Sequence, residues 1–307
     1  MSLIKPIILK CKTENIKTMK KILLAFLFVF VILSGNKEVK GQDQSLLWKI
    51  TGNELEEPSY LYGTIHLICQ DDFFMDDAVK QAFSNTDQVV LEIDFDDPNF
   101  AGDLQKNMVN PGNKNTSDVL NDDQKAILNT YFKQKYGADL SRLGMMRPFA
   151  LLSMVIQKQI TCDNGTVSYE MSFVQLAQQE EKDISGLETV EEQFALFDDI
   201  PIEDQYGWVV ENIEDSVKML EEYNALKSAY IQQDLDALFD VFIESEQFES
   251  YADALLYKRN ANWIEAIEEF ITEKSSFIAV GAGHLPSEKG VIALLRNAGY
   301  TVTPVTE

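Results

Sequence analysis

The feature that most constrains this chain is a short motif that occurs twice and contains both of its histidines. Residues 63–67 read Gly-Thr-Ile-His-Leu, and residues 281–285 read Gly-Ala-Gly-His-Leu. Each copy ends a predicted strand and is followed by a predicted helix and a further strand. Ligands of open α/β sheets bind at the carboxyl ends of strands, so His66 and His284 are expected at one sheet edge.

These repeats predict an α/β fold whose mixed central sheet is built from two related strand-GxxH-helix-strand halves. The periodicity gives strands at 46–51, 59–65, 88–95, 276–281 and 300–305, the first two as a hairpin, and helices at 76–84 and 288–297. Residues 97–118 are polar and predict a loop. Helical spacing dominates the middle, with candidates at 122–136, 149–160, 168–180, 204–229, 232–246 and 250–272, and a short strand at 183–188. We therefore expect one domain over 42–307, with a large helical cap at about 122–272 inserted between the halves.

The amino end predicts a targeting segment that is not part of the fold. Lys20 and Lys21 precede an apolar run over 22–33, which is shorter than the ~20 residues that span a bilayer core. A basic start, a short apolar run and Gly41 before Gln42 are typical of a secretory signal over 1–41. Met19 is the natural start of such a signal, which leaves 1–18 as an extension or a mis-assigned start. We expect an exported protein, periplasmic or extracellular, with no stable membrane anchor after cleavage; an uncleaved anchor is the alternative.

Charge excludes one class of partner. The 307 residues include 26 Lys and Arg against 50 Asp and Glu, a formal charge of −24. Residues 1–41 hold eight Lys and two Glu, so the chain after cleavage carries −30. Binding nucleic acid needs a basic face, and this composition argues against it. Beyond the signal the chain keeps Cys69 and Cys162, which either form one disulfide or stay as separate buried thiols.

The two histidines are the best candidates for chemistry. Imidazole suits a divalent transition metal or a general base, and the motif glycines let the backbone approach a ligand closely. Glu92 is the best additional carboxylate, because it lies in an otherwise apolar strand and would need a partner if buried. The alternation of the strand equally allows Glu92 to face solvent.

Several further motifs, in order and spacing, give the chain a family resemblance. They are Tyr-Gly-Thr-Ile-His at 62–66, Leu-Glu-Ile-Asp at 91–94, Met-Arg-Pro-Phe at 146–149, Gly-Leu-Glu-Thr at 186–189, Glu-Glu-Gln at 191–193, Lys-Arg-Asn at 258–260 and Val-Gly-Ala-Gly-His-Leu at 280–285. Together they resemble the TraB/GumN family, which includes the Tiki proteins of animals. The resemblance runs from about Leu46 to Val305 and implies a fold of the erythromycin-esterase/ChaN-like type.

The resemblance implies a function and a set of site residues. Tiki proteins link two GxxH motifs and a glutamate to metal-dependent proteolysis, which carries over to His66, Glu92 and His284 as ligands of Mn²⁺, Co²⁺ or Zn²⁺. Glu92 is either the third ligand or the general base, and Arg259 would neutralise charge on the substrate carbonyl oxygen. The alternative for Arg259 is an exposed arginine on the surface of a helix, without a role in the site. The supporting residues are Gly63, Gly281, Gly283, Glu188, Arg147 and Asn260.

Two other interpretations stay open at this point. The related esterases place a His, a Glu, an Arg and a second His in this chain order, so a metal-independent hydrolase with a histidine base fits too. A binding protein for a peptide, a signal or haem, without turnover, is of a different class, since two histidines can also ligate haem iron. The peptide or small-molecule substrate is not defined by the sequence. The stretch before Glu170 lacks the glycine that is common in the family, which argues against a role for that acid.

Overall fold

A six-stranded mixed sheet forms the centre of the fold. The structure is a computed structural model that describes residues 44–244 and 250–306. The predicted signal segment lies outside the described residues. The sheet has the strand order β6-β4-β7-β2-β1-β8. Its strands are β1 (Leu47–Thr51), β2 (Ser59–Thr64), β4 (Gln88–Ile93), β6 (Asp183–Glu188), β7 (Ser276–Gly281) and β8 (Thr301–Pro304).

The strand directions bring the carboxyl ends of four strands to one edge. β7 runs parallel to β2 on one side and to β4 on the other, and β4 is parallel to β6. β1 is antiparallel to both β2 and β8, so the predicted hairpin and the predicted mixed sheet are confirmed. The first strands of the two predicted halves, β2 and β7, are direct neighbours. The two GxxH motifs therefore leave the sheet side by side.

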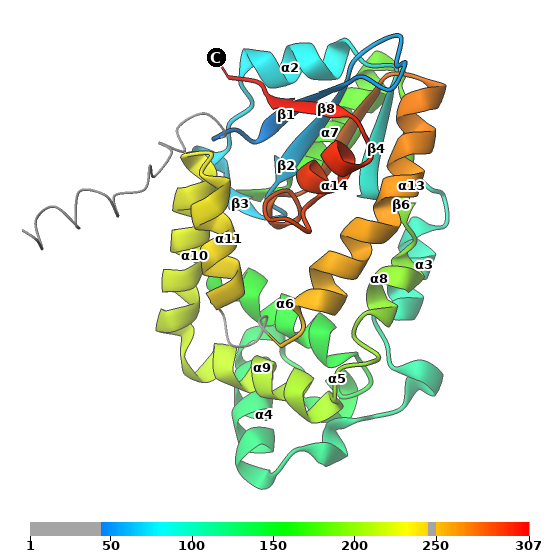
Figure 1. Cartoon of the computed structure of the whole chain (residues 1–307). Helices are drawn as coiled ribbons and strands as arrows, with labels where there is room; N and C mark the ends of the chain where they lie inside the picture. The colour runs from blue at the N-terminus through cyan, green and yellow to red at the C-terminus, as the bar shows by residue number, and fades with distance from the viewer. Residues whose placement is uncertain (1–43, 245–249, 307) are drawn as a thin grey trace, which may run out of the picture. The chain divides into compact units, whose positions relative to one another are not determined.

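Helices cover both faces of the sheet. On one face, Phe83 of α2 (Asp77–Ser84) and Phe173 of α7 (Tyr169–Glu180) pack against Phe277 of β7, with ring centroids 5.2 and 4.9 Å away. Figure 1 shows α7 behind the sheet and α14 (Val291–Asn297) in front of it, where α14 packs on α13 (Lys258–Glu273). The central strands β4 and β7 are buried along almost their whole length, as the near-continuous apolar runs of these parallel strands require.

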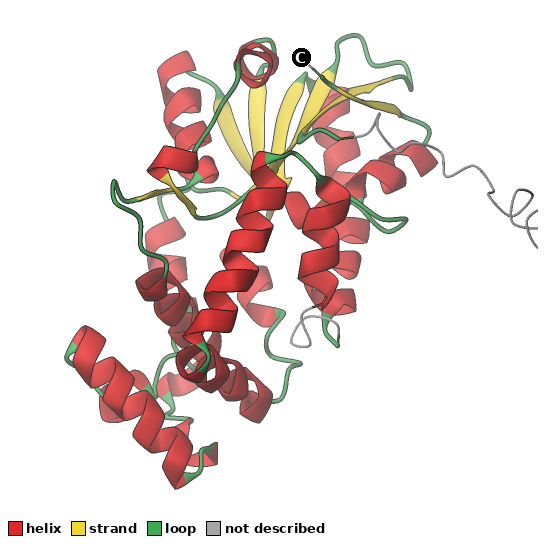
Figure 2. Cartoon of the chain, turned by 90° about the vertical axis from the view of Figure 1, so that its left-hand side faces the viewer, coloured by secondary structure: helices red, strands yellow, loops and turns green. Residues whose placement is uncertain are grey.

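Part of the predicted helical middle forms a second layer with its own core, whereas α7 and β6 of the same stretch belong to the sheet layer. Figures 1 and 2 show helices below the lower ends of the strands. Their core includes Leu128, Phe132, Leu151, Val155 and Tyr206. Among the helices of the described segments, none has the length and hydropathy that a membrane span needs. The remaining helices are α3 (Phe100–Asn107), α4 (Asp122–Tyr136), α5 (Leu140–Leu143), α6 (Pro148–Gln159), α8 (Val190–Ala195), α9 (Ile202–Glu214), α10 (Ser216–Ile231) and α11 (Leu235–Glu244), with a π-helical turn η4 (Asp253–Tyr257) before α13.

Two local predictions were wrong. The predicted single helix at 204–229 is two helices, because Asp215 leaves the helical conformation (φ −114°, ψ 59°) and its carboxylate accepts the Lys218 N–H at 3.0 Å as the N-cap of α10. The predicted loop at 97–118 contains α3. That helix is mostly exposed and is anchored by Phe100, whose ring lies 5.0 Å from that of Phe95.

A disulfide resolves the open question about the two cysteines. Cys69 and Cys162 are bonded, 93 residues apart in sequence. Cys69 ends the short strand β3 (Ile68–Cys69), which pairs with β5 (Thr166–Val167) in a separate two-stranded ladder. The ladder and the disulfide together tie the segment after His66 to the segment that leads into α7.

Candidate functional site

The paired motifs place their histidines at the carboxyl ends of β2 and β7. In the ladder between these strands Thr64 pairs with Gly281, so both chains leave the sheet at the same level. Glu92 comes from β4, on the other side of β7, and its Oε1 accepts the backbone N–H of Gly281 at 2.7 Å. Three neighbouring strands thus present His66, His284 and Glu92 at one edge, and the repeat predicted this placement for the two histidines.

Glu92 is buried rather than solvent-facing. It is 6 % exposed, and its Oε2 accepts hydrogen bonds from Arg259 Nη2 at 2.7 Å and from Gln193 Nε2 at 3.2 Å. Burial acts to raise the pKa of Glu92, but the basic groups around it and the Gly281 N–H outweigh that effect and hold this pKa well below its usual range. Glu92 is therefore a carboxylate at neutral pH.

Arg259 joins the charged groups of the site. It lies on α13 and is 9 % exposed, so the surface interpretation is excluded. Its Nε and Nη2 bind the Glu188 carboxylate at 2.8 to 3.1 Å, and Nη2 also donates to Glu92. Nη1 donates to the Leu255 carbonyl at 3.2 Å and contacts His284 Nε2 at 3.1 Å. All five N–H groups of the guanidinium are engaged within the chain, so in this state Arg259 holds Glu92 rather than offering a donor to a substrate.

His284 is held as a neutral imidazole. Arginine can only donate, so Nε2 of His284 accepts the hydrogen bond from Arg259 and the proton resides on Nδ1. Nδ1–H then donates to Asn260 Oδ1 at 2.6 Å, and the Asn260 amide nitrogen donates to the Lys289 carbonyl at 2.9 Å. Burial and the nearby guanidinium lower the pKa of His284 to about 3. The Trp263 ring lies 4.5 Å from the imidazole and covers it.

His66 has the opposite environment. Its Nδ1 is 2.9 Å from Glu170 Oε1, and its side chain is 71 % exposed to the pocket, whereas that of Glu170 is only 6 % exposed. Desolvation by the pocket walls acts to lower the pKa of His66, but the Glu170 carboxylate outweighs it and raises this pKa to about 9. Burial acts to raise the pKa of Glu170, yet the imidazolium and two hydroxyl donors lower it to about 2. The two side chains therefore form an ion pair at neutral pH.

Glu170 is the site residue that sequence reasoning discounted. The structure corrects that interpretation, because Glu170 accepts hydrogen bonds from Thr64 at 2.7 Å and Ser168 at 2.6 Å as well as contacting His66. Its signal in the sequence is an acid at the start of a helix whose neighbours Tyr169 and Phe173 are core residues. The missing glycine that seemed to argue against it does not affect these contacts.

A cavity of about 380 Å³ opens above the polar groups. His66, Glu92, Arg259 and His284 all line it, and most of the remaining wall is apolar. Gly281 leaves space at its base: a Cβ there would lie 3.3 Å from Glu92 Oε1, 3.5 Å from His284 Cδ2 and 3.8 Å from His66 Nε2. The cavity thus reaches the point where the three side chains face one another.

The other predicted residues have different places. Gly283 lines the cavity, whereas Gly63 lies under it and permits close packing, since a Cβ there would come within 3.1 Å of Ala282. Arg147 is paired with Asp198 and lines a separate pocket beside Pro148. The structure therefore brings Asn260 to His284 and Glu188 to Arg259, and leaves Arg147 away from the cavity.

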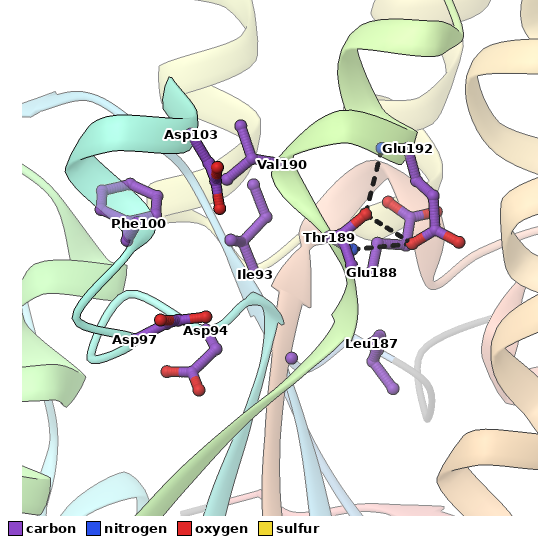
Figure 3. A pocket seen from close by; sticks show the side chains of 11 residues that line it. Ile93, Asp94, Asp97, Phe100, Asp103, Leu187, Glu188, Thr189, Val190 and Glu192 are labelled. Carbon is purple, nitrogen blue, oxygen red and sulfur yellow. Dashed lines mark hydrogen bonds between the residues drawn. The ribbon is translucent and has the colours of Figure 1, made fainter. Parts of the chain in front are cut away.

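A second, acidic pocket borders the site at Glu188. Figure 3 shows its carboxylates around the ends of β4 and β6, and its volume is about 270 Å³. Glu192 in its wall accepts hydrogen bonds from the N–H and hydroxyl of Thr189 at 2.8 and 2.9 Å, which caps α8. The acidic side chains are Asp94, Asp97, Asp103, Glu188 and Glu192. Negative charge therefore gathers beside the histidine cavity, and Glu188 of this pocket binds Arg259, which lines that cavity.

Paired GxxH strand ends with a buried glutamate and arginine, under a helical layer, define a class of α/β proteins with a polar site at the sheet edge. The TraB/PrgY/gumN family model matches residues 46–304, and the chain belongs to this family. The chain is 24 % identical to metalloprotease TIKI1 of Danio rerio, over 84 % of this chain and 62 % of that protein. It is 25 % identical to metalloprotease TIKI1 of Homo sapiens, over 88 % and 64 % respectively. The chain thus spans a little under two thirds of these relatives, and no solved structure matches it.

Proposed function

We propose that the protein is an exported, metal-dependent hydrolase of peptide bonds, with His66, Glu92 and His284 as the metal ligands. One observation carries the proposal: these three side chains come from three adjacent strand ends and face the space that Gly281 leaves open. The names of the TIKI relatives support the reaction class, and the disulfide supports an oxidising compartment.

The residues present fit such an ion in their chemistry. Two imidazoles and a carboxylate are donors that Mn²⁺, Co²⁺ and Zn²⁺ accept. Glu170 on His66 and Asn260 on His284 are outer partners of the kind that orient metal-ligating imidazoles. Within 44–244 and 250–306, no group of three or more His, Cys, Asp or Glu side chains is already gathered as a metal site. The donor atoms of His66, His284 and Glu92 are therefore of the types that such an ion binds, and in this structure these side chains are positioned by their hydrogen bonds to Glu170 and Arg259.

The chain's own residues perform definite tasks in this proposal. A bound ion would supply Lewis-acid polarisation of the substrate carbonyl and activation of water. Glu92 contributes a carboxylate that stays ionised, as a third ligand or as the base that takes a proton from water. Arg259 fixes that carboxylate against the Gly281 N–H. His66 must release a proton before it can ligate, because only the neutral ring is a ligand.

A second candidate is a metal-independent hydrolase, and a specific observation favours it. The lone pair of His284 Nε2 already accepts an Arg259 N–H. Glu170 keeps His66 protonated, so that this imidazolium can act as a general acid. Two histidines with pKa values displaced in opposite directions suit acid–base chemistry without an ion. In this mechanism His66 would protonate the leaving group.

The experiment that separates these candidates uses protein without a histidine tag. A peptide library is incubated with metal-stripped protein and with Mn²⁺, Co²⁺ or Zn²⁺ restored, and products are read by mass spectrometry. We expect cleavage only with metal, and its loss in Glu92→Gln but not in Glu221→Gln, the same change on the exposed face of α10. Equal cleavage with and without chelator would replace the metal mechanism by the acid–base one. If folded, metal-loaded protein cleaves nothing, the hydrolase proposal fails and the binding protein remains.

A further inference from the structure

We infer that the substrate of this site presents a bulky, uncharged apolar side chain next to the reacting bond. The inference rests on the proposed function and names its substrate class. It follows from three properties of the cavity above His66 and His284: the composition of its walls, the pairing of its charges and its volume.

The walls above the polar floor are apolar and come from several helices. α10 contributes Leu226, α8 contributes Phe194 and its C-cap residue Leu196, and η4 contributes Leu255. Leu226 and Phe194 are only half-buried, so part of each side chain faces the cavity. When an apolar ligand group covers apolar surface that faces a cavity, removal of that surface from water stabilises the complex by about 25 cal/mol per Å².

The charges of the cavity are already compensated within the chain. Glu92 shares Arg259 with Glu188, and His66 is paired with Glu170. His66, Glu92, Arg259 and His284 are the only ionisable residues in the described lining of this cavity. A charged substrate side chain would lose its hydration there without finding an unpaired opposite charge, which is costly. The carboxylates of Figure 3 line a neighbouring pocket, and none of them lines the apolar walls of the histidine cavity.

The volume limits the substrate to a short segment. About 380 Å³ lies at the lower end of the range of ~300–1,000 Å³ for small-molecule pockets. This space accommodates one or two large side chains of an extended peptide and excludes folded chain. The selective element is therefore the apolar residue or residues that flank the bond above Gly281.

Binding of two blocked dipeptides tests the inference without turnover. Isothermal titration of the full chain with acetyl-Phe-Leu-amide should give a Kd at least tenfold lower than with acetyl-Asp-Lys-amide. Leu226→Asp should weaken binding of the apolar probe at least tenfold. Val217→Asp, the same change at a 65 % exposed position of the same helix, should leave it within twofold. Equal affinity for both probes, or no effect of Leu226→Asp in folded protein, would overturn the inference.

A second variant guards against a folding defect. Leu226→Trp keeps the wall apolar and narrows the cavity, so it should weaken acetyl-Phe-Leu-amide more than acetyl-Ala-Ala-amide; loss of both to the same degree counts against the cavity as the binding place. Library cleavage without preference for apolar flanking residues sinks the inference and leaves the hydrolase proposal standing. Selective binding of the apolar probe without any cleavage sinks the hydrolase proposal and leaves the apolar preference of the cavity standing.

Discussion

Replacing Arg259 by methionine should destabilise the protein strongly, because it leaves two buried carboxylates without their counter-charge. The side chains of Glu92 and Glu188 are 8 % and 11 % exposed, and both bind this one guanidinium. Removing one partner of a buried ion pair costs roughly 3–5 kcal/mol. For a chain of this size roughly 2–4 °C of melting temperature is lost per kcal/mol, so we expect Tm to fall by roughly 6–20 °C.

Urea unfolding at pH 7, followed by circular dichroism, measures this change. Arg142→Met, at an exposed arginine, is the matched control and should stay within about 0.5 kcal/mol of the parent. The informative variant is the triple change Arg259→Met, Glu92→Gln and Glu188→Gln. It removes all three charges, so it should recover most of the lost stability while leaving the protein inactive.

Two results would refute this reasoning. A loss below about 1 kcal/mol in Arg259→Met would mean that solvent or neighbouring groups already screen the carboxylates, contrary to their burial. A triple variant no more stable than the single one would mean that methionine disturbs packing, for example against Trp263, whose ring lies 4.8 Å from the guanidinium carbon. In either case Arg259 would not be the electrostatic centre of the site.

Three further predictions concern the disulfide, the His66 ion pair and the motif glycine. Replacing Cys69 and Cys162 by serine should lower the free energy of unfolding by about 4–5 kcal/mol on the chain-entropy scale for a 93-residue separation, measured in urea; no change would mean that the loop is ordered without the bond. Because the pKa of His66 is raised, the stabilisation from its ion pair is complete below about pH 6.5 and is lost as pH rises through about 9. Because the pKa of Glu170 is lowered, the same stabilisation is lost again as pH falls through about 2. The stability deficit of Glu170→Gln should therefore be largest between about pH 4.5 and 6.5, and a pH-independent deficit would contradict the pairing. Gly281→Ala puts a Cβ 3.3 Å from the carboxylate oxygen at the site and should abolish activity with little change in Tm; normal activity would show that this space is not used.

The sequence was most informative where local pattern and function coincide. Alternating apolar runs and the repeated motif predicted β2, β7 and their shared edge correctly, because the carboxyl ends of parallel strands lie at the same edge of a sheet. The break at Asp215 was missed, since amphipathic helices continue on both sides and one capping acid resembles a surface residue. The helix α3 was missed because its residues are mostly polar and exposed.

The site was predicted as far as its residues lie in the motifs. His66, Glu92, Arg259 and His284 were expected near one another, and the structure brings them together. The contact between His66 and Glu170 joins residues 104 positions apart. The β3–β5 ladder and the disulfide join the segments next to these two residues, and neither has a periodic signal in the sequence. Long-range pairing of this kind cannot be read from spacing alone.

The two halves of the sheet make the histidines equivalent in position, and the inserted helices make them different in chemistry. Glu170 of α7 raises the pKa of His66 to about 9, whereas burial and Arg259 of α13 lower that of His284 to about 3. An ion that enters the site must therefore displace a proton from one ring and an arginine N–H from the other. Only the first of these steps depends on pH in the neutral range, so the pH dependence of metal affinity should report on His66 alone. Glu170→Gln should shift that dependence to lower pH, because it removes the charge that holds the proton.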